Sequence, residues 1–198
     1  SYESGKEINH DYGLSLEVLK QYPHGLDLGP LQPCLPEYLF TNDKLIHLLP
    51  EPILDDFQQM KVQFSGKASK SLMMISRRDL RTNNSWMHNS QRLIKGKDRC
   101  ALLIHPEDAK EKGIVDRGKA FLKSRVGELK VDVVITEDVM RGVVCLPHGW
   151  GHDREGIALR VAQTNPGVSM NDLTSDQRVD SLSGNAIFNG VPVEITSC

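Results

Sequence analysis

Amide, hydroxyl and basic side chains gather in one short segment of this 198-residue sequence, RTNNSWMHN at residues 81–89. The segment lies within residues 77–99, which hold seven basic and two acidic residues. Side-chain amides both donate and accept hydrogen bonds, and guanidinium groups neutralise phosphate oxygens. The segment is therefore typical of a loop that recognises an anionic ligand, with a solvated turn built on Asn side chains as the alternative. Its candidate residues are Asn83, Asn84, Ser85, Trp86, His88 and Asn89.

A second candidate segment, CLPHGWGHD at residues 145–153, has glycines on both sides of Trp150. Glycine lets the backbone approach a flat ligand closely, and loops at strand ends often carry binding sites. A zinc site formed by Cys145, His148 and His152 is an alternative. The two histidines lie on a glycine-rich loop and no fourth ligand is nearby in the sequence, so the spacing does not favour zinc.

The third candidate segment, residues 169–190, reads SMNDLTSDQRVDSLSGNAIFNG. Asn171, Asp172 and Thr174 offer donors and acceptors that match the edge of a base or a pterin. A surface loop with turns closed by Asn and Asp side chains is the alternative. The sequence has no HExxH, GxSxG, Walker or GxGxxG motif, so the common catalytic and phosphate-binding signatures are absent.

Short strands must position these three segments, because apolar runs of four to eight residues alternate with polar loops from residue 71 onward. Asn189 and Gly190, between two apolar runs, predict a hairpin turn. Pro106, the acidic residues after it and Gly113 predict a helix within HPEDAKEKG. With no alternation of strands and helices, the pattern favours a small barrel. The predicted strands are Leu72–Ser76, Ala101–Ile104, a hairpin in residues 119–136 that turns at Gly127, Val143–Pro147, and the two arms of AIFNGVPVEI at 186–195.

The first sixty residues differ from the rest, with six of the ten prolines and ten acidic against three basic residues. We expect short helices near 14–21 and 36–40, a strand at 45–49, and a helix from Glu51 to about Met60, followed by a flexible linker at 65–71. Such a segment buries little surface by itself. We therefore expect residues 1–70 to form a proline-rich acidic arm and linker, and residues 71–198 to form one domain.

Composition limits the class of protein further. Hydrophobic residues make up 39% of the chain, and no apolar run approaches the roughly 18 residues of a membrane span. The first ten residues have no targeting pattern. The four cysteines are far apart and form no CxxC motif, which favours a reducing compartment. We expect a soluble, cytoplasmic protein.

Taken in order, four motifs resemble the C-terminal molybdopterin-dinucleotide-binding domain of the bis-pterin molybdenum oxidoreductases. These motifs are SRRDLRTNNSWMHN, HPEDAKEKGI with a VGE turn, VMRGVVCLPHGWGH and NDLT. The family includes formate dehydrogenases, nitrate reductases and dimethyl sulfoxide reductase, and the resemblance covers about residues 71–198. Residues 1–70 look like part of the preceding domain in such enzymes. The resemblance implies a mainly β fold, a six-stranded double-psi β-barrel with short helices, preceded by an irregular N-terminal arm.

The resemblance also implies which residues bind the cofactor. The first loop departs from the family pattern at Arg77, where a glycine is usual, and an Asp-Gly turn is usual where Arg117 and Gly118 stand. The implied cofactor-binding residues are Arg78, Asn83, Asn84, Ser85, His88, His148, Gly149, Trp150, Asn171 and Thr174.

The implied cofactor is molybdopterin guanine dinucleotide, with molybdenum or tungsten held by the parent enzyme. An iron–sulfur cluster would belong to the parent and not to this chain, and we expect no catalytic residue or metal ligand here. The expected partners are the remaining domains of the parent oxidoreductase, with no nucleic acid and no membrane span. A nucleic-acid or protein-adaptor-binding β-barrel without redox function is the alternative, although Trp86 is the only aromatic residue in the basic stretch.

Overall fold

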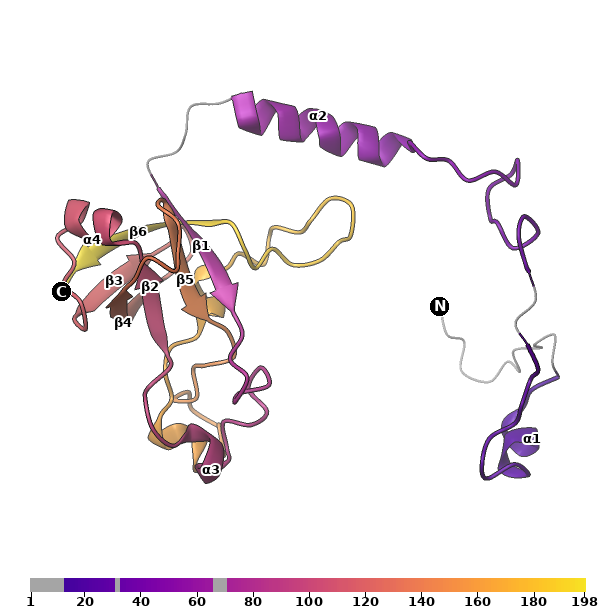
Figure 1. Ribbon diagram of the computed structural model, residues 1–198, viewed down its shortest axis with the longest axis horizontal. Coiled ribbons are helices and arrows are strands. Elements are labelled where there is room, and N and C mark those ends of the chain that lie inside the picture. Colours follow the sequence, from indigo (N-terminus) through magenta and orange to yellow (C-terminus); the bar gives the residue numbers. More distant parts are fainter. Residues whose placement is uncertain (1–12, 31–32, 66–70) are drawn as a thin grey trace. The chain divides into compact units, whose positions relative to one another are not determined.

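The computed structural model describes residues 13–30, 33–65 and 71–198 (Figure 1). The chain divides into two compact units, Ser1–Pro50 and Glu51–Cys198. In the first unit, helix α1 spans Leu16–Lys20, and the Ser15 side chain caps it by accepting a hydrogen bond from the Val18 amide at 3.2 Å. The second unit begins with helix α2, Glu51–Ser65. The expected boundary between arm and barrel domain, at residue 70, stays a prediction.

Six strands of the second unit close into a barrel (Figure 1). Their order around the barrel is β1-β5-β2-β4-β3-β6. The strands are β1 Leu72–Arg77, β2 Ala101–Ile104, β3 Lys119–Lys123, β4 Glu128–Ile135, β5 Val143–Pro147 and β6 Val191–Ser197.

The strand pairing has an internal repeat, in which β1, β2 and β3 correspond to β4, β5 and β6. The parallel pair β1 and β5 becomes β4 and β2, which is also parallel, and the antiparallel pair β3 and β4 becomes β6 and β1, also antiparallel. The pairs β2 with β5 and β3 with β6 are antiparallel and map onto themselves. The barrel therefore consists of two interlocked halves, which confirms the expected double-psi β-barrel.

Aliphatic side chains fill the barrel interior because alternate residues of each strand point inward. In β3, for example, Ala120 and Leu122 are buried and the three lysine and phenylalanine neighbours are exposed. Burying each large aliphatic side chain stabilises the fold by about 1.5–3 kcal/mol. The core includes Met74, Leu102, Ile104, Leu122, Val131, Val133, Val144, Leu146, Val193 and Ile195.

The remaining helices are short and lie between strands. Helix α4, Pro106–Glu111, confirms the predicted helix, and the His105 side chain caps it by accepting from the Glu107 amide at 3.2 Å. In the described part of the chain, no helix is long and apolar enough to cross a membrane. The others are α3 Gln91–Ile94 and the 3-10 helices η1 Ala162–Thr164 and η2 Met170–Leu173.

Several expectations for the first sixty residues were wrong. Residues 36–40 form no helix: a turn covers residues 35–38, and the Tyr38 amide donates to the Cys34 carbonyl at 3.0 Å. Residues 45–49 are not a strand, because within the described residues no neighbouring strand pairs with them. Helix α2 extends beyond Met60 to Ser65. The predicted linker falls mostly on residues 66–70, outside the described ranges.

The predicted hairpin at 186–195 was half right. Strand β6 forms, but the preceding apolar run makes only an isolated bridge between Ala186 and Val179. Both edges of β6 are already paired with β1 and β3, so no edge remains for that run. Asn189 and Gly190 instead bond to β1: the Gly190 amide donates to the Met74 carbonyl at 3.0 Å. The Asn189 Oδ1 atom accepts from the Ser76 amide at 2.7 Å.

Candidate functional site

Two of the three candidate segments start side by side because β1 and β5 are parallel neighbours (Figure 1). Arg77, the last residue of β1, is in register with Pro147, the last residue of β5. The His148 amide donates to the Arg77 carbonyl at 2.9 Å, which continues the pairing by one residue. Parallel strands end at the same edge, so the loops that follow them leave the barrel together.

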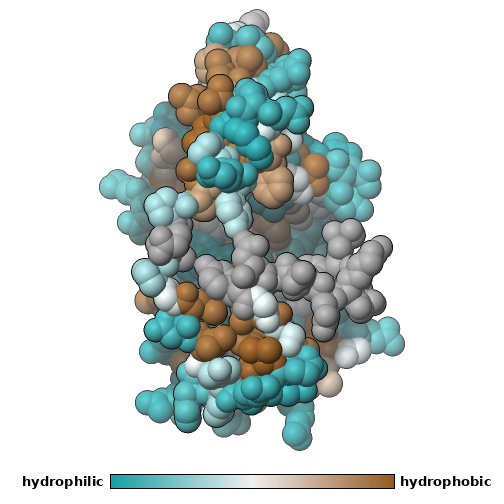
Figure 2. Space-filling view, turned by 90° about the vertical axis from the view of Figure 1, so that its right-hand side faces the viewer, coloured by the Kyte–Doolittle hydropathy of each residue, from teal (hydrophilic) through white to brown (hydrophobic). Residues whose placement is uncertain are grey.

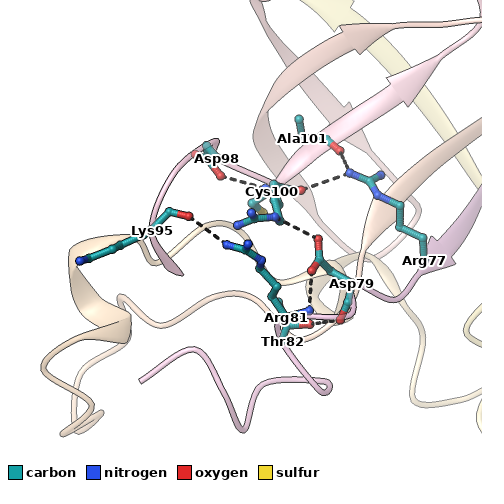
Figure 3. Close-up of polar contacts among 9 residues, drawn as sticks. Arg77, Asp79, Arg81, Thr82, Lys95, Asp98, Cys100 and Ala101 are labelled. Carbon is teal, nitrogen blue, oxygen red and sulfur yellow. Dashed lines mark hydrogen bonds and ion pairs between the residues drawn. The ribbon is translucent and has the colours of Figure 1, made fainter. Parts of the chain in front are cut away.

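Arg77 fixes this end of the barrel. Its guanidinium donates to the carbonyls of Cys145 at 2.8 Å, Ala101 at 2.8 Å and Arg99 at 3.2 Å. Figure 3 shows this side chain reaching across to the start of β2 at Ala101. Two backbone acceptors in β5 and β2, and a third just before β2, occupy its donors, so Arg77 has a structural role in this fold.

Asp79 organises the first loop from within (Figure 3). Its carboxylate accepts from the Arg81 amide at 2.8 Å and lies 3.4 Å from the Arg99 guanidinium, and its carbonyl accepts from the Thr82 hydroxyl at 3.0 Å. The Arg81 guanidinium donates to the Lys95 carbonyl at 3.5 Å. Part of the basic stretch therefore binds the loop's own acceptors. Arg78 differs: it is exposed, and its guanidinium donates to the Asn84 side-chain oxygen.

The first and second loops are in direct backbone contact. Asn83 and Asn84 have φ angles of 42° and 62°, the left-handed region that Asn tolerates better than most residues. Gly149 has a φ of 92°, and a Cβ atom there would lie 2.2 Å from the Asn84 carbonyl oxygen. Only glycine permits both this backbone angle and this approach. The structure thus brings Asn84, Ser85 and Gly149 together.

The third segment adjoins the second loop through Gly151. Its φ is 104°, and a Cβ atom there would lie 2.6 Å from the Cβ of Ser169, the residue just before η2. Asn171 is exposed, and its carbonyl accepts from the Thr174 hydroxyl at 3.0 Å. Helix η2 also packs against β4. The three candidate segments therefore form a continuous series at one end of the barrel.

Three aromatic side chains of the site are buried beneath these loops. His88 is 1% exposed and Trp150 is 7% exposed, with ring centroids 4.2 Å apart. The Nδ1 atom of His88 lies 2.5 Å from the Nε2 atom of buried His152. The Nε2 of His88 and the Nε1 of Trp150 are buried without a hydrogen-bond partner among the described residues. His148 is half-exposed, with its ring edge-on to Phe188 at 5.4 Å.

The buried histidines are held neutral by their surroundings. Burial and the neighbouring His152 lower the pKa of His88 from 6.5 to about 4, and the Asp79 carboxylate opposes this shift. Burial also lowers the pKa of His152, while Asp153 and a backbone hydrogen bond to Gly149 raise it. A buried charge without a partner is costly, so the neutral rings are favoured near pH 7.

The alternative zinc site is not assembled. The His152 ring faces His88, and the buried Cys145 thiol lies 3.9 Å from the Arg77 guanidinium. Within residues 13–30, 33–65 and 71–198, no group of three or more His, Cys, Asp or Glu side chains is placed to hold a metal ion.

Sequence reasoning missed two structural residues of the site. His152 was considered only as a zinc ligand, although it is the partner of His88. Asn89 was considered only as a ligand-recognition residue, although its Oδ1 accepts from the Val161 amide at 2.9 Å and the Ala162 amide at 3.3 Å. No local pattern reports such contacts, because the partners are 64 and 72 residues apart in the sequence.

Comparison with known proteins identifies the class of this domain. The family model described as molydopterin dinucleotide binding domain matches residues 72–192, from the first residue of β1 into β6. The chain belongs to this family. The resemblance found in the sequence motifs is confirmed, and the barrel with its end loops is a molybdopterin-dinucleotide-binding domain.

Two known proteins are similar to parts of this chain. The alpha subunit of F420-dependent formate dehydrogenase 1 from Methanococcus maripaludis is 37% identical over 60 residues, which are 30% of this chain and 9% of that subunit. The structure of acetylene hydratase from Pelobacter acetylenicus matches 78% of this chain at 18% identity with a TM-score of 0.55, and 21% of that protein is covered. The chain therefore spans a small part of either protein.

Proposed function

We propose that this chain holds molybdopterin guanine dinucleotide for a molybdenum- or tungsten-dependent oxidoreductase of which it forms one part. The observation that carries the proposal is the series of three loops at one barrel end, joined at Gly149 and Gly151, in a chain of the dinucleotide-binding family. The loops bring amide and guanidinium groups together where loop backbone is accessible. This is the type of surface that a dinucleotide with phosphates and a hydrogen-bonding ring needs.

The residues fit the cofactor in two ways. Arg78 is exposed beside Asn84, so a guanidinium and an amide are available for a diphosphate. Gly149 keeps the second loop free of a side chain where it meets the first. We assign Arg78, Asn83, Asn84 and Ser85 to the phosphates. We assign His148, Gly149, Asn171 and Thr174 to the ring system.

His88 and Trp150 have a different part in this proposal. Both are buried, so they support the loops from below and do not form the outer surface of the site. The bound cofactor supplies the redox metal, and this chain supplies position and hydrogen bonds. The chain by itself is not catalytic in this proposal, because the metal ligands and any iron–sulfur cluster belong to other domains of the parent.

The proposed partners are these other domains of the parent oxidoreductase. The small share of the two known proteins that the chain covers supports this view. We also propose a cytoplasmic location. The four cysteines, Cys34, Cys100, Cys145 and Cys198, are free thiols, as is usual in a reducing compartment.

Nucleotide titration of the isotope-labelled chain tests the proposed function. With guanosine diphosphate, we expect amide resonances of residues 78–90, 148–152 and 171–174 to shift together in NMR spectra. Binding should be weak, because one domain offers only one wall and loop ordering offsets much of the hydrogen bonding. Adenosine diphosphate should shift them less if the site reads guanine. Shifts confined to Cys145, His148 and His152 on addition of zinc would contradict the proposal.

A further inference from the structure

The contact between His88 and His152 joins the first two loops of the site from beneath. His88 belongs to the first loop and His152 to the second, and their ring nitrogens lie 2.5 Å apart. We propose that His152 is a positioning residue for the dinucleotide site, which fixes the first loop through a neutral, single-tautomer hydrogen bond to His88. This inference rests on the proposed function and adds to it a residue that does not touch the ligand.

We assign the tautomers of the pair from the surroundings of His152. A neutral imidazole has one N–H and one bare nitrogen. The backbone hydrogen bond that raises the pKa of His152 needs an acceptor, which is the Gly149 carbonyl. Since Nε2 of His152 faces His88, its Nδ1 carries the proton toward Gly149. The bare Nε2 of His152 then accepts from the Nδ1–H of His88, and the Nε2 of His88 is a bare acceptor.

The surroundings of the pair disfavour protonation of both rings. The facing charged groups are Asp79, which is paired with Arg99, and Asp153. The ring centroids of Trp150 and His88 are 4.2 Å apart. Trp150 can pack there because Gly167 has no side chain: a Cβ at that position would lie 2.7 Å from the Trp150 Cε3 atom. A doubly protonated pair would point one N–H at another inside this packing. The contact is therefore lost when both rings are protonated.

Backbone bonds carry the position of His88 to the proposed ligand residues. The His88 amide donates to the Ser85 carbonyl at 3.2 Å, and the Trp86 amide donates to the Asn83 carbonyl at 3.3 Å. A shift of the His88 ring would therefore move the turn that contains Asn83 and Ser85. It would also disturb the Asn84 backbone where it contacts Gly149.

Imidazole nitrogen NMR of the full 198-residue chain at pH 7, without ligand, tests the tautomer. We expect the Nδ1 of His88 to be protonated and its Nε2 to be bare. A protonated Nε2 on His88 would overturn the assignment. This readout needs no nucleotide, so it stands apart from success or failure of the proposed function.

The pH profile of binding separates positioning from simple packing. For guanosine diphosphate, we expect the dissociation constant of the wild-type chain to rise as the pH falls from 7 to 4, where protonation of both rings breaks their contact. His152→Gln should change less than twofold, because its side-chain oxygen accepts from His88 whether or not His88 is protonated. His24→Gln, at an exposed residue of the first unit, should follow the wild type. A His152→Gln profile equal to the wild-type profile would overturn the proposal.

A second measurement tests the proposal even if a variant does not fold or no nucleotide binds. His152→Leu should weaken nucleotide binding at least fivefold at pH 7. Unchanged binding would count against a positioning role of the His88–His152 hydrogen bond. If this variant does not fold, or if no nucleotide binds, the amide resonances of Asn84 and Gly149 decide. They should move together between pH 7 and pH 4 in the wild type and stay fixed in His152→Gln. Equal movement in both would refute the role of His152.

Discussion

Two adjacent arginines of this domain have opposite surroundings because one still belongs to a strand and the other starts a loop. Arg77 donates to three backbone carbonyls, at Cys145 in β5, at Ala101 in β2 and at Arg99 just before β2. Arg78 is exposed and bonds to the Asn84 side chain of its own loop. The backbone of Arg78 directly follows a strand and is held in place. Binding an anion therefore costs less conformational entropy for Arg78 than for an arginine on a mobile loop.

Replacing Arg78 by Ala should therefore weaken binding of guanosine diphosphate by about three- to tenfold, since an exposed charge-assisted hydrogen bond contributes about 1 kcal/mol. Arg92→Ala is the matched control, because Arg92 is also exposed and lies in the same basic stretch. Isothermal titration of both variants measures the difference. In the proposed parent enzyme, metal and nucleotide content should fall for Arg78→Ala alone. A larger loss from Arg92→Ala would place the phosphate at the other end of the stretch.

Gly149→Ala should destabilise the fold by roughly 2–4 kcal/mol, because strain at positive φ adds to a clash with the Asn84 carbonyl. Gly156→Ala is the control. Its φ is 85°, but no atom lies within 4 Å of the added Cβ, so it carries only the strain of about 1 kcal/mol. Urea unfolding measures both free energies. Equal values would mean that the two loops are not in backbone contact.

At the scale of elements, the end of β1 is held by a residue of the segment before β6. The Asn189 Oδ1 accepts from the Ser76 amide at 2.7 Å and from the Ser76 hydroxyl at 3.0 Å. These bonds satisfy the backbone amide and the hydroxyl of Ser76, just before Arg77, where the first loop leaves the barrel. Order in this loop thus depends on a segment more than 100 residues away in the sequence.

Asn189→Ala should cost about 1 kcal/mol of stability and speed exchange of the Ser76 amide, because that donor loses its acceptor. Hydrogen exchange followed by NMR reports the rate directly. Asn185→Ala serves as the control, since its side chain makes no hydrogen bond with the described residues. Unchanged protection of Ser76 in Asn189→Ala would show that the strand end is held by other contacts.

At the scale of the whole molecule, the barrel unit should lose stability in acid. The pKa of His88 is about 4 when folded, against 6.5 in an unfolded chain, so the unfolded state binds the proton first. Stability is therefore fully present above pH 6.5 and falls as pH drops toward 4, by at most roughly 3 kcal/mol. Urea unfolding at pH 7, 5.5 and 4.5 measures this slope. His88→Gln should reduce the dependence of the free energy of unfolding on pH. An unchanged dependence would mean that other groups cause the loss of stability in acid.

The first unit should exchange its amide hydrogens quickly in the isolated chain. None of its described side chains is buried, and residues such as Leu16, Phe40 and Leu48 are exposed. Figure 2 shows patches of apolar side chains on an exposed surface of the chain. Without a core of its own, such a segment opens locally at little cost. Protection in residues 13–30 and 33–50 comparable with that of Val131 to Ile135 would contradict this expectation.

The sequence by itself determined the elements that depend on local chemistry. Alternating apolar residues predicted β3 and β4, and Pro106 with the acidic residues after it predicted α4. The motifs in residues 76–89 and 139–152 also pointed to the family. These features are readable because side-chain period and capping act between residues a few positions apart.

Only the tertiary structure decided how the site is assembled. The parallel pairing of β1 and β5 places two loops together, and closure of the barrel uses both edges of β6 and removes the predicted hairpin. The same packing buries His88 and Trp150, which the motifs assigned to the ligand, and pairs His88 with His152. These outcomes depend on contacts between residues from 64 positions apart, His88 and His152, to 121 apart, Leu72 and Val193. No local pattern carries that information, because the barrel must close before such contacts exist.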